Sequence, residues 1–176
     1  MLQIEIPSSE LFDEINNEFI QTKAQVLRLE HSLVSISKWE STWCKPYLSS
    51  DKTNEQIYDY VRCMTLTQNV SPDIYTYIPV NILFEIQEYI NRPMTATWFS
   101  DTGRKSRRII TSELIYYWMI ALNIPFECQK WHLNRLLTLI GVCNSENNPK
   151  KLSQSEIFER NRQINAQRRM NMKSKG

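Results

Sequence analysis

The chain has 176 residues, of which 41% are hydrophobic and 11% aromatic, and it carries a formal net charge of +2. These proportions supply one folded core and exclude an intrinsically disordered chain. Only three glycines occur in the sequence, which argues against a glycine-rich phosphate loop and favours a fold built mainly of helices.

The N-terminal segment has the pattern of a small antiparallel sheet or hairpin. Leu2, Ile4 and Ile6 alternate with polar residues, which is typical of a half-buried strand. Asn16 and Asn17 lie between two stretches that contain apolar residues, and asparagine tolerates the positive φ of a hairpin turn. The alternation resumes after this turn, so a second strand is expected there.

The next part of the chain changes to helical periodicity. The stretch LVSISKWESTW places Trp39 and Trp43 on one face of a predicted helix that ends before Pro46. Thr53 and Gln56 form a capping box, which marks the start of a second helix.

Prolines mark the limits of two further helices. Ser71 followed by Pro72 starts a short helix, because proline suits the first helical position. An amphipathic helix follows over residues 82–90 and stops before Pro93. Residues 94–108 have the composition of a mobile loop with a basic end.

An apolar pair of helices is predicted next. Thr111 or Ser112 caps the first helix, which is apolar nearly all round and is therefore expected in the middle of the fold. The second helix is predicted to begin at Pro125 and to pack antiparallel to the first, because the NIP turn between them is short. Trp118 and Leu137 are expected to be buried.

The composition shifts near the C-terminus. Residues 149–176 carry 8 Lys and Arg against 2 Asp and Glu. Ser153 and Glu156 form a capping box for a helix that has few apolar anchors. We therefore predict a basic C-terminal tail or helix outside the core.

Together these elements predict an α+β fold class that is mostly α-helical, with a small N-terminal antiparallel β-sheet or hairpin followed by a helical bundle and a basic C-terminal helix. We predict a single globular domain over residues 1–148, made of the sheet (1–31) and a helical core (32–148). The basic tail then occupies residues 149–176.

The two halves of the chain have opposite charge. Residues 1–88 contain 6 Lys and Arg against 13 Asp and Glu, a balance of −7, whereas residues 89–176 contain 15 against 6, a balance of +9. This asymmetry indicates either a charged partner or head-to-tail contact between copies, and it leaves both open.

The sequence also predicts the compartment. The four cysteines show no C-x-x-C spacing, and the N-terminus lacks the pattern of a secretory leader, so reduced thiols in the cytosol are expected. The longest uncharged apolar run, residues 114–124, is shorter than the roughly 20 residues that span a bilayer. We expect a soluble protein that contacts no membrane.

The stretch FECQKWHLNRL places Cys128 and His132 four residues apart, on one face of the predicted helix. A thiolate and an imidazole suit zinc, but no further ligand has matching spacing, and His31 lies far away on a predicted strand. The same pair would form a nucleophile and base with Glu127 or Asn134 as the orienting group. The favoured interpretation is that Cys128 is a small buried hydrophobe, with no metal, no cofactor and no catalytic residue.

Basic residues provide candidate contacts for a partner. The stretch TGRKS fails the phosphate-loop pattern, because Trp98 and Arg104 occupy the positions of the first glycine and the lysine. Trp131 and Arg135 are expected to form a surface cation–π pair. The candidate partner-binding residues are the exposed basic side chains of the loop and the tail: Arg104, Lys105, Arg107, Arg108, Arg160, Arg162, Arg168, Arg169, Lys173 and Lys175.

Three stretches resemble a group of small proteins encoded in the tail modules of tailed phages, or siphophages: LEHSLVSISKWESTW (residues 29–43), MTATWF (94–99) and IITSELIYYWMIALNIPFECQKWHLNRLLTLI (109–140). The nearest named family is the tail assembly chaperones. The likeness covers most of residues 2–143, and the basic NAQRR ending is similar as well.

This resemblance implies a non-enzymatic chaperone or adaptor that binds the tape measure protein, recruits the major tail protein of the tail tube, and acts in the host cytoplasm. It assigns no catalytic residue and no cofactor. Two alternatives stay open: a structural virion protein of the tail or head–tail connector, and a nucleic-acid-binding protein that uses the basic residues. Homo-oligomerisation is compatible with each of them.

Overall fold

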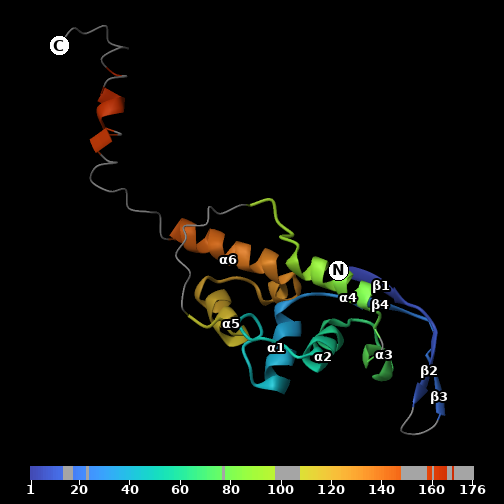
Figure 1. The fold of residues 1–176 in the computed structure, drawn as a ribbon. Coiled ribbons are helices and arrows are strands. Elements are labelled where there is room, and N and C mark those ends of the chain that lie inside the picture. Colours follow the sequence, from blue (N-terminus) through green and yellow to red (C-terminus); the bar gives the residue numbers. More distant parts are fainter. Residues whose placement is uncertain are drawn as a thin grey trace. The chain divides into compact units, whose positions relative to one another are not determined.

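The chain has an α+β fold that is mostly helical, as the sequence predicts. The computed structural model describes residues 1–13, 18–22, 24–76, 78–97 and 108–147, together with residues 158–159, 161–165 and 168. It divides into two units, Met1–Gly141 and Val142–Gly176. The first unit carries both sheets and almost all of the helices, which Figure 1 labels in chain order.

Two antiparallel pairs of strands form the N-terminal sheets, which confirms the predicted sheet. Strand β1 (Leu2–Ile6) pairs with β4 (Gln25–Leu29), and β2 (Ser9–Asp13) pairs with β3 (Glu18–Thr22). Alternate residues of β1 are buried, as a half-buried strand requires. The Asn16 and Asn17 of the predicted turn lie outside the described residues.

The edge of strand β4 is covered by the residues at and just after the C-terminal end of helix α2 (Asn54–Met64). The N–H of Glu30 donates to the carbonyl of Met64 over 3.0 Å, and the N–H of Leu66 donates to the carbonyl of Arg28 over 2.8 Å. These bonds satisfy backbone groups that an uncovered edge would leave to water. They also fix the end of that helix against the sheet.

Four helices follow the sheet: α1 (Leu33–Trp43), α2 (Asn54–Met64), α3 (Asp73–Thr76) and α4 (Val80–Asn91). The predicted capping box of Thr53 and Gln56 is present at the start of α2. A second box, made by Ser32 and Ser35, starts α1. In each box, side chains satisfy N–H groups that the first helical turn leaves unpaired.

The C-terminal part of the first unit holds α5 (Ser112–Ala121), the 3-10 helix η1 (Phe126–Lys130) and the beginning of α6 (Leu133–Asn147). Thr111 caps α5 through its side chain, as predicted. The prediction of one helix from Pro125 onward is wrong. Trp131 is extended between η1 and α6, and the next residue, His132, forms a β-bridge with Ser32 that interrupts the helix.

The expected position of α5 is also wrong. Ile115 and Met119 are fully buried, but Trp118 and Leu137 are only half-buried, and the opposite face of α5 is open to solvent. The main neighbour of α5 is α1, and not α6 as the short connection predicts. In Figure 1, α1 lies between α5 and α2, with α3 beyond α2.

The core of the first unit gathers around α1, the inner faces of its neighbours and the β1–β4 pair. Its largest fully buried side chains are Leu27, Leu29, Leu33, Ile36, Trp39, Val61, Met64, Tyr89, Ile115, Met119, Leu133 and Leu136. The indole N–H of Trp39 donates to the carbonyl of Gln56 over 2.9 Å, so α1 and α2 are joined by a buried bond as well as by packing.

Candidate functional site

The sequence places Cys128 and His132 on one helical face, and this prediction is wrong. Cys128 lies in η1 and His132 precedes α6, so no single helical face carries both side chains. Nδ1 of His132 accepts from the N–H of Asn134 over 3.3 Å, which leaves the hydrogen on Nε2. Nε2 donates to the carbonyl of Tyr89 over 3.0 Å. Both ring nitrogens are therefore already bonded within the fold.

Asn134, the other proposed orienting residue, also bonds to α4. Its side-chain amide donates to the carbonyls of Ile90 and Arg92 over 3.0 and 2.8 Å. These carbonyls lie at the end of α4, where helical carbonyls lack partners within the helix. Asn134 and His132 thus cap the C-terminal end of α4.

The structure brings His31 beside His132, which their separation in the sequence conceals. Their ring centroids lie 5.1 Å apart, and Nδ1 of His31 is 2.5 Å from the hydroxyl of Tyr60. We call His31, His132, Tyr60 and Tyr89 the histidine cluster. Within the part of the chain that the structure describes, no three His, Cys, Asp or Glu residues gather in a way that would hold a metal ion.

Burial keeps both histidines neutral. Burial, together with a smaller effect of the neighbouring His132, lowers the pKa of His31 to about 3. Burial also lowers the pKa of His132, although its bond to the Tyr89 carbonyl acts in the opposite direction. The carboxylate of Glu30, which accepts from the Tyr89 hydroxyl over 2.6 Å, also favours a charge on His132, but burial has the larger effect. The bonds of the cluster join separate segments of the fold, so we interpret it as a structural junction.

Glu40 is a buried carboxylate for which the sequence predicts no role. Its Oε1 accepts from the N–H of Tyr47, and its Oε2 accepts from the N–H of Ser112, each over 2.7 Å. These bonds tie α1 to its following loop and to the first turn of α5. In the sequence, Glu40 lies next to Trp39 on the apolar stripe of the predicted helix, and this position could have indicated a buried carboxylate.

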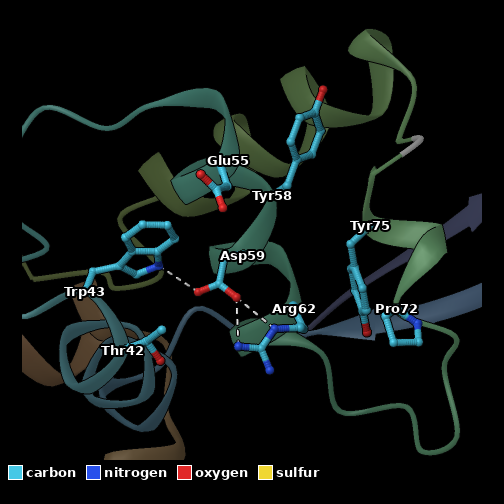
Figure 2. A pocket seen from close by; sticks show the side chains of 8 residues that line it. All are labelled: Thr42, Trp43, Glu55, Tyr58, Asp59, Arg62, Pro72 and Tyr75. Carbon is cyan, nitrogen blue, oxygen red and sulfur yellow. Dashed lines mark hydrogen bonds and ion pairs between the residues drawn. The ribbon is translucent and has the colours of Figure 1, made fainter. Parts of the chain in front are cut away.

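A pocket of about 440 Å³ opens between α1, α2 and the segment that leads into α3. Figure 2 shows the eight side chains that line it: Thr42, Trp43, Glu55, Tyr58, Asp59, Arg62, Pro72 and Tyr75. We call it the Asp59 pocket. No sequence motif indicated it, because its walls come from three separate elements.

Asp59 fixes the inner wall of this pocket. Its Oδ2 accepts from the indole N–H of Trp43 over 2.8 Å. Its Oδ1 accepts from Nε and Nη2 of Arg62 over 2.8 and 2.7 Å, which raises the pKa of that guanidinium. Figure 2 shows the carboxylate between these two groups. Trp43 and Arg62 are thus held in place before any ligand arrives.

The thiol of Cys63 lies 4.0 Å from the Asp59 carboxylate, and its surroundings disfavour the reactive thiolate form. Burial, together with a smaller effect of the nearby Asp59 carboxylate, raises the pKa of Cys63 to about 11. The thiolate is the nucleophilic form of cysteine, and it is scarce at neutral pH with such a pKa.

A second surface feature lies on α5, on η1 and on the residues just before α5. Four large apolar side chains are exposed there: Ile109 (62%), Tyr117 (63%), Ile120 (61%) and Phe126 (52%). We call them the α5–η1 surface. Tyr117 and Ile120 lie three residues apart and share one face of α5. Phe126 stacks at 6.4 Å on Tyr116 of the same helix.

The predicted basic contacts are only partly described. Arg108 is exposed in the first unit, whereas Arg162 and Arg168 are exposed in the second. The others lie outside the described residues: Arg104, Lys105, Arg107, Arg160, Arg169, Lys173 and Lys175. The predicted cation–π pair is present, with the guanidinium carbon of Arg135 at 4.1 Å from the Trp131 ring centre.

No protein-family model, curated protein or solved structure matches this chain. The helices of the described residues are all too short or too polar to cross a membrane.

Proposed function

We propose that this protein is a non-enzymatic chaperone or adaptor of phage tail assembly. It binds the helical tape measure protein, recruits tail tube subunits and acts in the cytoplasm of the host. The observation that carries the proposal is the α5–η1 surface, which exposes large apolar side chains on the outer face of α5. The resemblance to tail assembly chaperones supplies the identity of the partners.

The α5–η1 surface has the character of a protein-binding face. Tyr117 and Ile120 occupy positions that an isolated globular protein usually fills with polar residues. Burying apolar surface contributes about 25 cal/mol per Å², so covering these side chains favours association. An amphipathic partner helix laid on such a face is a common mode of recognition.

The roles of the buried polar groups support a binding function. Glu40 bridges three segments, His132 and Asn134 cap α4, and Asp59 holds Trp43. In each case the side chain forms bonds that hold helices together. Rigid packing of this kind presents a surface in one fixed shape, which lowers the entropic cost of binding.

The test is co-expression with the tape measure protein and the major tail protein encoded beside it. The tape measure protein is expected to stay soluble and to co-purify with the intact chain. Replacing both Tyr117 and Ile120 with serine should weaken this complex at least tenfold, because the central apolar contacts are lost. The matched control is Phe84→Ser, which removes an equally exposed apolar side chain from α4.

Two results would overturn the proposal. One is equal co-purification of the tape measure protein with the intact chain and with the Tyr117 and Ile120 variant. The other is stoichiometric retention of the protein in finished phage particles, because an assembly chaperone leaves before the particle is complete. That second result would establish the structural virion protein instead.

A further inference from the structure

The Asp59 pocket has features that the α5–η1 surface does not explain. We propose that it binds the guanidinium group of an arginine side chain on a partner protein. This inference rests on the proposed function for the existence of a protein partner, and it adds the chemistry by which a second part of that partner is recognised.

The charge of the pocket favours a cation. Three charged side chains line it, and the carboxylate of Asp59 is already paired with Arg62. Glu55 makes no ion pair or hydrogen bond with any described residue, and it is exposed at the pocket. The balance is therefore one negative charge, which attracts a cation more strongly than an anion.

The aromatic walls favour the same kind of ligand. Trp43, Tyr58 and Tyr75 contribute rings to the pocket, and aromatic faces attract cations. Figure 2 shows Trp43 and Tyr58 on either side of Glu55. A planar guanidinium stacks on an indole and offers paired donors to a carboxylate, whereas an ammonium group does neither as well.

This chain already uses the same contact elsewhere. The guanidinium of Arg135 lies over the Trp131 ring, and the ammonium of Lys52 lies 4.3 Å from the Tyr47 ring centre. Both of those rings have their own cation from the chain. Trp43 has none among the described residues, although it lines an open pocket.

A purely structural role accounts for part of this arrangement. Glu55 lies in the first turn of α2, where a carboxylate stabilises the helix dipole, and Asp59 joins α1 to α2. Neither role requires the open pocket of about 440 Å³ that these two side chains help to line. A ligand in that volume would meet Glu55 and the aromatic rings together.

The test uses short peptides and the intact chain. The peptide acetyl-Gly-Arg-Gly-amide is titrated while the indole N–H resonance of Trp43 is followed by NMR. We expect a saturable shift that weakens as salt is added, since the contact is charged and partly exposed. The matched peptide contains citrulline, which has the same shape without the charge, and it should bind at least tenfold more weakly.

Two variants locate the contact. Glu55→Gln should weaken binding of the arginine peptide about threefold to tenfold, because it removes the carboxylate but keeps the size of the side chain. Glu85→Gln removes an exposed carboxylate from α4, outside the pocket, and should leave binding unchanged.

Several outcomes would contradict the inference. They are equal binding of the citrulline and arginine peptides, tighter binding of a matched glutamate or lysine peptide, no shift of Trp43 with any peptide, or unchanged binding to Glu55→Gln. These results would leave the co-purification with the tape measure protein unaffected. If, instead, the tape measure protein failed to co-purify with the intact chain, the result of the peptide titration would not change. The two proposals can therefore fail separately.

Discussion

The histidine cluster and the Asp59 pocket both set tyrosine side chains around a polar centre, but they differ in what surrounds that centre. In the cluster, His31 and His132 are almost completely buried and are bonded to Tyr60 and to the Tyr89 carbonyl. In the pocket, Asp59 is bonded on one side and faces an open volume on the other. Saturated, buried polar groups hold the fold, whereas partly open ones leave room for a ligand.

The largest expected effect comes from breaking the histidine cluster. His132→Ala removes the donor to the Tyr89 carbonyl and the acceptor for the Asn134 N–H. The Asn134 N–H then loses this acceptor, and the Tyr89 carbonyl keeps only its bond from the Arg92 N–H. Together with the loss of the buried ring, this should lower the free energy of unfolding by about 2–4 kcal/mol. Urea denaturation measures it, and Arg135→Ala, an exposed change one helical turn away, is the control.

A change of pH tests the same cluster without a mutation. The histidine pKa values are lowered in the folded protein, so the unfolded chain takes up protons first as the pH falls below 6.5. Stability is full above that pH and is lost progressively toward the folded pKa of His31, about 3. Between pH 7.5 and 5.5 we expect a loss of about 1–2 kcal/mol, measured by urea denaturation.

A substitution in the Asp59 pocket should lower the stability less than His132→Ala does, and it should leave the pH dependence of the stability unchanged. Asp59→Ala removes the acceptor for Trp43 and Arg62, but the guanidinium is half-exposed and water replaces its bond. We expect a loss of only about 1 kcal/mol in the free energy of unfolding. The same variant should keep the full loss of stability between pH 7.5 and 5.5, since both histidines remain. A flat pH profile in this variant would contradict the assignment of that loss to the cluster.

The smallest effect on stability is expected at Glu55. Glu55→Gln should change the free energy of unfolding by less than about 0.5 kcal/mol, because the side chain is exposed and contributes only to the dipole of α2. Thermal denaturation of Glu55→Gln measures this change, and Glu85→Gln is the control. A loss as large as that of His132→Ala would show that Glu55 holds the fold and is not free for a ligand.

Local features of the fold could be predicted from the sequence. The capping box of Thr53 and Gln56, the cap at Thr111 and the alternation along β1 depend on residues a few positions apart. Their physical causes are contained within one turn or one strand. The overall class, a small sheet followed by helices, follows from these local patterns.

The errors arose where distant residues decide the conformation. The second apolar helix was expected to start at Pro125, but the β-bridge of His132 to Ser32 and its bond to Tyr89 hold that region extended until α6 begins. The burial of Leu137 was predicted together with the packing of α6 against α5, whereas Leu137 is only half-buried. Leu136 is the buried residue instead.

The candidate site was beyond the reach of sequence patterns for the same reason. Trp43, Asp59 and Tyr75 come from α1, α2 and α3, and no spacing in the sequence relates them. The exposed face of α5 was hidden by a different effect. Hydrophobicity all round a helix indicates burial in a monomer, yet it is equally compatible with a face that a partner covers.

The central claim is that the α5–η1 surface receives the tape measure protein. Hydrogen–deuterium exchange on the purified complex and on the free chain tests it directly. We predict slower exchange in the complex over residues 109–126, with unchanged exchange over the outer face of α4 around Phe84. Unchanged exchange over residues 109–126 in a complex that nevertheless forms would contradict the claim.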